Sequence, residues 1–110
     1  MVRRGDLIWL SLDPTLGHEQ KGRRPALVVS SDAFNRSTGM AFVCPITSTN
    51  RGYLHHIPVG SKKIEGFVMC EHLKSIDYRA RKAKFIAKAP EVLMANVSNC
   101  IEAILAISVS

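Results

Sequence analysis

A polar loop at residues 17–24 holds the densest group of side chains that could do chemistry. Loops on rigid scaffolds often carry function, and this one is longer than a simple connection between strands needs. Arg24 stands out because Pro25 and an apolar run follow it, so its backbone is fixed while its guanidinium can reach an adjacent groove. For each other residue of the loop taken alone, a solvated turn explains the pattern better. The polar side chains of the loop are those of His18, Glu19, Gln20, Lys21, Arg23 and Arg24.

Three other polar groups lie close to apolar runs. Thr47, Ser48 and Thr49 end an apolar segment, where hydroxyls either satisfy turn amides or donate to a phosphate oxygen. Glu71 follows the apolar residues 67–70, where a carboxylate needs a partner or an open sheet end. Arg79 and Arg81 belong to a basic cluster that is either a solvated face or a track for phosphates.

The charge balance favours a polyanionic partner. The chain has 15 Lys and Arg against nine Asp and Glu, a net charge of +6, and residues 89–110 contain no basic residue. Lys and Arg on such a surface gain affinity by releasing the counterions that nucleic acids condense. Charge alone favours nucleic acid only slightly, because many small basic proteins are simply well solvated.

The sequence predicts a cytoplasmic protein without a cofactor or a metal. Its three cysteines are far apart and form no CxxC pair, and its four histidines lack HExxH-like spacing. No apolar run reaches the roughly 18 residues that span a bilayer, and the N-terminus lacks a secretory signal pattern. At 110 residues we expect a single domain over residues 1–110.

The hydrophobic pattern predicts a mainly β fold of the α+β class, with five or six short strands and two helices. A short helix over residues 32–36 should begin at Ser31 and end at Gly39. A terminal helix should open at residues 89–91, with Pro90 at its first position and an apolar stripe along one face. Pro58 favours an edge strand. These elements fit a strongly bent sheet or small barrel, with strands expected at residues 6–12, 25–30, 40–46, 56–59, 66–76 and 84–87.

Several motifs in order give the chain a family resemblance. It resembles the MazF/PemK/Kid toxins, and the match covers nearly the whole chain, leaving only the terminal helix poorly defined. Collinear motifs at the expected spacings are far more specific than any single pattern. The motifs are RGDLIW (4–9), DPT (13–15), GHEQ (17–20), RPALVVS (24–30), FN (34–35), PITS (45–48), CEHLKSID (70–77) and RAR (79–81).

This resemblance implies an SH3-like barrel, a homodimer, metal-independent and sequence-specific cleavage of single-stranded RNA, and an acidic antitoxin as partner. The family's catalytic arginine falls on Arg24 and its threonine on Thr47, while the Kid-type histidine falls on His18. Where Kid-type members place an arginine and an aspartate, this chain has Met69 and Glu71. The general base is therefore left open among His18, Glu19 and Glu71. The expected RNA-binding residues are Gln20, Lys21, Arg23, Ser48, Arg79 and Arg81.

The expected chemistry is attack of the RNA 2′-hydroxyl on the adjacent phosphorus, which leaves a 2′,3′-cyclic phosphate and a 5′-hydroxyl. Arg24 would stabilise the charge on the phosphorane, and Thr47 and Ser48 would donate hydrogen bonds to the phosphate. Two alternatives remain at this stage. One is a gyrase-poisoning toxin of the CcdB type, and the other is a non-catalytic SH3-like module that binds nucleic acid.

Overall fold

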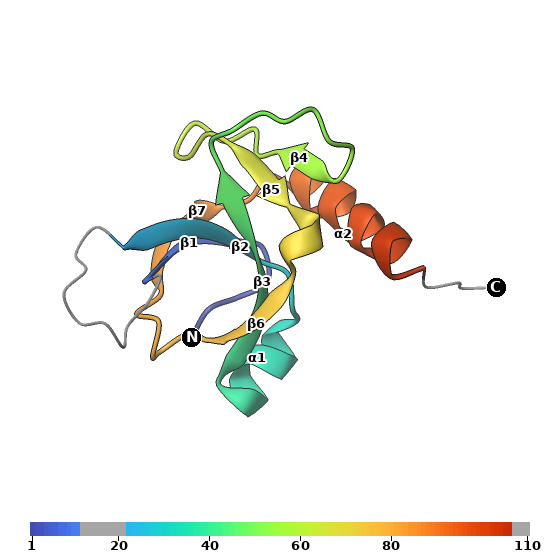
Figure 1. Ribbon diagram of the computed structural model, residues 1–110. Coiled ribbons are helices and arrows are strands. Elements are labelled where there is room, and N and C mark those ends of the chain that lie inside the picture. The colour runs from blue at the N-terminus through green and yellow to red at the C-terminus, as the bar shows by residue number, and fades with distance from the viewer. Residues whose placement is uncertain (12–21, 107–110) are drawn as a thin grey trace.

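Seven strands and two α-helices are present in the computed structural model, which describes residues 1–11 and 22–106 (Figure 1). The sequence predicted five or six strands. The difference arises because the extended stretch expected at 66–76 is divided by a 3-10 turn, η1. The elements are β1 (Asp6–Ser11), β2 (Arg23–Val28), α1 (Asp32–Thr38), β3 (Met40–Thr47), β4 (His56–Pro58), β5 (Phe67–Met69), η1 (Cys70–His72), β6 (Lys74–Asp77), β7 (Lys84–Lys88) and α2 (Glu91–Leu105).

The strands form one antiparallel, small-barrel-like sheet in the order β4-β5-β3-β2-β1-β7. The eight-residue β3 organises it, because its first half pairs with β6 and its last two residues pair with β5. In the described part of the chain no ladder joins β7 to β4 or β6, so the sheet stays open. The backbone N–H of Ser11 donates to the carbonyl of Arg81 at 2.8 Å, which brings the turn after β6 against the end of β1.

The central strands are apolar on both faces because each face covers a separate core. Successive side chains of a strand point to opposite sides of the sheet. One side of β1–β3 contributes to the first core and the other side to the second, on which α2 packs. The first core includes Ile8, Ala26, Val28, Val43, Ile76 and Tyr78, and the second includes Leu7, Leu27, Cys44, Val68, Leu93 and Val97.

Helix α1 has the ends that the sequence predicts. The Ser31 hydroxyl accepts a hydrogen bond from the backbone N–H of Phe34 at 3.2 Å. Gly39 ends the helix at a φ of 71°, and its N–H donates to the carbonyl of Asn35. The Asn35 side chain is fully buried, and its amide donates to the carbonyl of Val2 at 3.2 Å. The asparagine of the FN motif therefore holds the N-terminal segment against α1.

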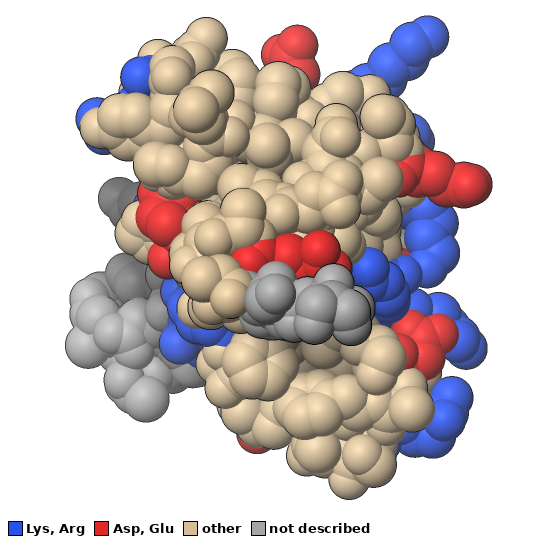
Figure 2. Space-filling model, turned by 90° about the vertical axis from the view of Figure 1, so that its right-hand side faces the viewer, with Lys and Arg blue, Asp and Glu red and all other residues tan. Residues whose placement is uncertain are grey.

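Helix α2 begins one residue later than predicted, since Pro90 is its N-cap and not its first helical residue. Leu93 and Val97 are buried, whereas Ile104 and Leu105 near the other end are 45% and 55% exposed. The apolar stripe thus packs on the second core from Leu93 to Ile101, and only its last residues are exposed. Seen from the α2 side, Lys and Arg lie mostly toward the edges of the surface and largely leave its centre (Figure 2). No helix within the described residues is long and apolar enough to cross a membrane.

Candidate active site

Arg24 and Thr47 lie two residues beyond the last pair of the β2–β3 ladder, on strand ends that run side by side up to that pair. The ladder matches Val28 with Val43 and Ala26 with Pro45. Continued by two residues, the same antiparallel register sets Arg24 opposite Thr47. Both then lie on the face of the sheet that covers the first core, because Ala26 and Val43 belong to that core. Two residues separated by 23 positions in the sequence therefore share one end of this strand pair.

A pocket on the same face collects three cationic side chains, those of Arg24, Lys74 and Arg81. The Arg24 side chain is exposed and makes no hydrogen bond or ion pair with a described residue. Arg81 is held more tightly, since its guanidinium Nη1 donates to the carbonyl of Ser11 at 3.0 Å. Three cationic side chains lining one pocket favour an anion at this part of the surface. The other lining residues are Leu10, Ser11, Pro25, Ala26, Val43, Pro45 and Ile76.

The hydroxyl cluster at the end of β3 has the first of the two roles that the sequence allowed, and the second stays a prediction. Thr47 is half-buried, and its Oγ1 accepts a hydrogen bond from the backbone N–H of Thr49 at 3.2 Å. That contact satisfies a turn amide and leaves the hydroxyl proton of Thr47 available to donate. Ser48 is exposed beside it. The turn is thus shaped by Thr47 itself, and its hydroxyl can still serve a bound phosphate.

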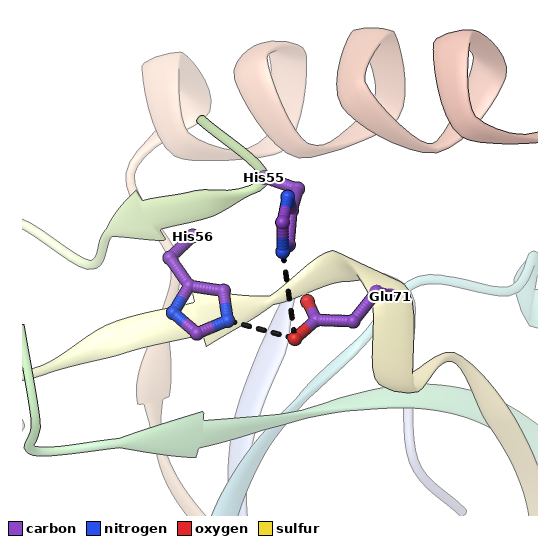
Figure 3. A group of neighbouring side chains, drawn as sticks. All are labelled: His55, His56 and Glu71. Atoms are coloured by element: carbon purple, nitrogen blue, oxygen red, sulfur yellow. Dashed lines mark hydrogen bonds and ion pairs between the residues drawn. The ribbon is translucent and has the colours of Figure 1, made fainter. Parts of the chain in front are cut away.

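Glu71 lies in a different group, with His55 and His56 (Figure 3). Its Oε2 is 2.8 Å from Nε2 of His56, and no hydrogen bond or ion pair joins it to Arg24 or Thr47. Burial pushes the pKa of Glu71 up, but the hydrogen bond with His56 and the charges of the His56 and His55 rings together hold that pKa below its ordinary value. The carboxylate is therefore an anion organised by histidines.

The remaining predicted residues are dispersed. The Arg23 guanidinium lies 4.4 Å from the ring centre of Trp9, in a cation–π contact. Arg79 lines a second pocket together with Phe85, and its backbone N–H donates to Asp77. His18, Glu19, Gln20 and Lys21 lie outside the described residues.

Sequence reasoning missed two features of these sites. Lys74 was noted only as part of a family motif, although it lines the Arg24 pocket. The grouping of His55 and His56 with Glu71 was not predicted, because these residues do not have the spacing of a known metal-binding motif. One ligand atom from each of these three residues lies within 4.8 Å of the others. The sequence signal that could have predicted this group is the adjacent pair His55-His56, followed by Glu71-His72 in the next predicted strand.

Comparisons with known proteins show the family of the chain. Residues 3–105 match the family described as PemK-like, MazF-like toxin of type II toxin-antitoxin system. The chain is 42% identical over 90 residues to the endoribonuclease toxin MazF of Escherichia coli K12, covering 81% of each chain. It is 37% identical over 109 residues to the Escherichia coli endoribonuclease PemK, covering 94% of this chain and 82% of PemK.

Solved structures support the same relationship. A MazE–MazF structure from Deinococcus radiodurans superimposes with a TM-score of 0.88 at 36% identity, over 97% of this chain and 98% of that one. The MazF structure from the same organism gives a TM-score of 0.84 at 38% identity, over 96% and 97%. With a family match over nearly its full length and relatives above 30% identity, this chain belongs to the PemK-like, MazF-like toxin family of type II toxin–antitoxin systems.

Proposed function

We propose that the protein is a toxin that acts as a sequence-specific endoribonuclease, cleaving single-stranded mRNA in the cytoplasm and thereby stopping translation and growth. The observation that carries this proposal is a pocket lined by the cationic side chains of Arg24, Lys74 and Arg81, next to the β2–β3 ladder whose continuation would set Arg24 opposite Thr47. The names of its relatives, which are endoribonucleases, support the same activity.

In the proposed reaction the RNA 2′-hydroxyl attacks the adjacent phosphorus and expels the 5′-oxygen of the next nucleotide. The guanidinium of Arg24 stabilises the charge that develops on the phosphorane, and the hydroxyls of Thr47 and Ser48 donate to its oxygens. An acid–base pair moves the two protons, a contribution typically worth about 10²–10⁴-fold. No metal takes part in this scheme. The requirement for a 2′-hydroxyl makes RNA, and not DNA, the substrate.

The acid and the base come from His18, Glu19 and Glu71. The contacts of Glu71 with His56 and His55 favour a positioning role for this carboxylate, which leaves His18 and Glu19 as the preferred pair. Gln20, Lys21, Arg23, Ser48, Arg79 and Arg81 bind the RNA on either side of the cleaved bond. The cation–π contact of Arg23 with Trp9 supports this role by fixing the guanidinium while leaving it exposed.

Arg24→Ala tests the mechanism. Cleavage of a long RNA, measured in EDTA, should fall by about 10²–10³-fold, as when one electrostatic donor is lost from a transition state. The melting temperature should stay within about 2 °C, because Arg24 is exposed and its substitution removes no core contact. The control is Arg36→Ala, which removes an exposed arginine of α1 that does not line the pocket and should cleave at the parent rate.

Product ends separate the proposal from its alternatives. The parent should leave 2′,3′-cyclic phosphates and 5′-hydroxyls, and an oligonucleotide with a 2′-deoxyribose at the cleaved position should resist. A CcdB-type gyrase poison would inhibit growth equally well after Arg24→Ala, and a non-catalytic module would retain RNA without creating new ends. Parent-like cleavage by the Arg24→Ala protein would show the mechanism to be wrong.

We further propose that the toxin is a homodimer neutralised by an acidic antitoxin. Val92, Ile104 and Leu105 of α2 are 67%, 45% and 55% exposed, more apolar surface than one helix usually leaves in water. Two copies would join two basic surfaces, about +12 in total from the +6 of each. An acidic segment could then fold along them and compete with RNA. Light scattering should report about twice 12.1 kDa, and a monomer at micromolar concentration would contradict the dimer.

A further inference from the structure

Three histidine side chains converge on one carboxylate oxygen, that of Glu71, outside the pocket lined by Arg24. The Oε2 atom of Glu71 lies 2.8 Å from Nε2 of His56, 3.7 Å from Nε2 of His55 and 3.6 Å from Nε2 of His72. We call these four residues the histidine–glutamate cluster. Figure 3 shows the His55 and His56 rings, from the start of β4, both turned toward the Glu71 carboxylate on η1. None of the four lines the pocket of Arg24.

The local backbone explains why two adjacent histidines point the same way. Neighbouring residues of a regular strand would face opposite sides of the sheet. Here a turn precedes β4, in which the N–H of His56 donates to the carbonyl of Tyr53 at 3.1 Å. The carbonyl of His55 accepts from the N–H of Cys70 at 3.1 Å, which fixes His55 beside the start of η1. The turn and this bond bring both rings to Glu71.

Tyr53 holds the two rings in place. Its ring stacks on His55 with centroids 5.1 Å apart and meets His56 edge-on at 5.0 Å. The His55 and His56 rings are themselves nearly perpendicular, at 86°. The His56 side chain is only 3% exposed, whereas those of Glu71 and His55 are 33% and 39% exposed. The group therefore has one fixed, buried member and an open side facing solvent.

Two imidazoles and a carboxylate are a donor set suited to zinc. Zinc bonds to nitrogen and oxygen are about 2.0–2.2 Å long, so tetrahedral ligand atoms lie about 3.3 Å apart. The Nε2–Oε2 distances of 2.8, 3.6 and 3.7 Å bracket that spacing, and one ligand atom each of His55, His56 and Glu71 lies within 4.8 Å of the others. His72, on the exposed side, can supply the fourth ligand, or a water molecule can.

An ion pair alone does not account for the arrangement. Only His56 is within hydrogen-bond distance of Glu71, because 3.6 and 3.7 Å are too long for a hydrogen bond. His55 and His72 nevertheless present their Nε2 atoms to the same oxygen. We propose that the histidine–glutamate cluster binds one zinc ion, which joins the short edge strand β4 to η1. This site stands apart from the proposed RNA-cleaving residues Arg24 and Thr47.

The structure also limits how tightly zinc should bind. A ligating histidine usually donates its second ring nitrogen to a neighbouring acceptor, and loss of such a contact typically costs about 10–100-fold in metal affinity. Nδ1 of His56 is buried and has no hydrogen-bond partner among the described residues. We therefore expect a site weaker than a structural zinc centre by about that factor. Its effect should be stabilisation of the β4 edge and not folding of the whole chain.

Zinc binding can be measured on the full-length, untagged protein by competition with a chromophoric chelator. We expect one zinc per chain and a higher melting temperature in zinc than in EDTA. Glu71→Gln and His55→Asn should each weaken binding at least about tenfold and abolish the thermal shift, since each removes a ligand. His72→Asn should have a smaller effect. His56 is left unchanged because its ring is buried.

Two matched controls complete the design. Glu65→Gln removes an exposed carboxylate elsewhere, and Cys100→Ser removes the partly exposed thiol, so both should bind zinc like the parent. Substitution of Co²⁺ should give the visible absorption of a four-coordinate nitrogen and oxygen site. Absence of saturable binding, or equal affinity in the parent, Glu71→Gln and His55→Asn proteins, would overturn the proposal. Neither readout depends on RNA cleavage.

Discussion

Gly66→Ala should disturb the candidate active site from a residue that takes no part in the chemistry. A Cβ at this position would lie 2.5 Å from the backbone oxygen of Thr47 and 2.9 Å from Cγ2 of Ile46. The φ of Gly66 is 139°, a value that residues with side chains rarely adopt. The substitution therefore combines backbone strain with a clash against the end of β3, where Thr47 lies.

The magnitude follows from these two contributions. A strained φ costs about 1–3 kcal/mol, and forcing extra volume into a packed site costs about 1–3 kcal/mol more. We expect Gly66→Ala to lower the free energy of unfolding by about 3 kcal/mol, or the melting temperature by more than about 10 °C. Ordinary contact begins near 3.4 Å, so the Thr47 carbonyl must retreat by about 0.9 Å from 2.5 Å. A misplacement of that size near a reaction centre can cost about 10²-fold in rate.

Gly60→Ala is the matched control. Gly60 also has a positive φ, 70°, but a Cβ there meets nothing within 4 Å, so the cost should be about 1–2 kcal/mol with no loss of cleavage. Urea unfolding and the rate of RNA cleavage at a temperature where both variants are folded provide the comparison. Equal stability of the two variants would refute the clash. A destabilised Gly66→Ala protein that cleaves at the parent rate would show that the position of Thr47 is not limiting.

Two further predictions concern the second core. Leu93→Ala should lower the free energy of unfolding by about 2–5 kcal/mol, because this residue of α2 is only 1% exposed. Val92→Ala, at a position of α2 that is 67% exposed, should change the free energy of unfolding by less than about 0.5 kcal/mol. Similar urea midpoints for the two variants would contradict the packing of α2. Burial raises the pKa of the Cys44 thiol to about 12, whereas the thiol of an unfolded chain has a pKa of about 8.5. Above about pH 8.5 the folded state therefore holds more protons than the unfolded state, and the free energy of unfolding should fall as the pH rises. Cys44→Ala should remove about 1 kcal/mol of that loss per pH unit between pH 9 and 10, and parallel curves for parent and variant would contradict it.

The elements best predicted from the sequence are those with local signals. Ser31 and Gly39 fix both ends of α1 through contacts within a few residues, and both caps are present in the structure. Pro58 indicated an edge strand, and β4 stands at the end of the sheet order, where β5 is its one partner among the described strands. These predictions needed no knowledge of what the segments would meet.

The predictions that failed concern contacts between distant segments. Residues 67–77 contain no glycine or proline, so the local sequence does not indicate that the segment divides into β5, η1 and β6. The break has a tertiary cause, because η1 buries Cys70 in the second core and turns Glu71 toward His56, 15 residues earlier. The same contact groups Glu71, one of the three candidate acid–base residues, with histidines, and its role in cleavage stays a prediction.

The sequence predicted which residues form the candidate site, but not how they lie relative to one another in the fold. The family resemblance pointed to Arg24 and Thr47, yet their relation depends on the register of β2 against β3, which no local pattern determines. Lys74 enters the pocket only because β6 pairs with the first half of β3.

The two principal residues of the site are held by different parts of the sheet. Arg24 pairs with Leu10 of β1, and Thr47 pairs with Phe67 of β5, while the direct β2–β3 ladder stops at Ala26 and Pro45. A phosphate between them would therefore meet a cation supported by β1 on one side and hydroxyl donors supported by β5 on the other. Each residue has its backbone fixed by pairing with its own neighbouring strand, and fixed donors are what electrostatic stabilisation of a phosphorane requires. Gly66 permits the close approach of β5 to Thr47, and this is why its substitution is the most direct test of that requirement.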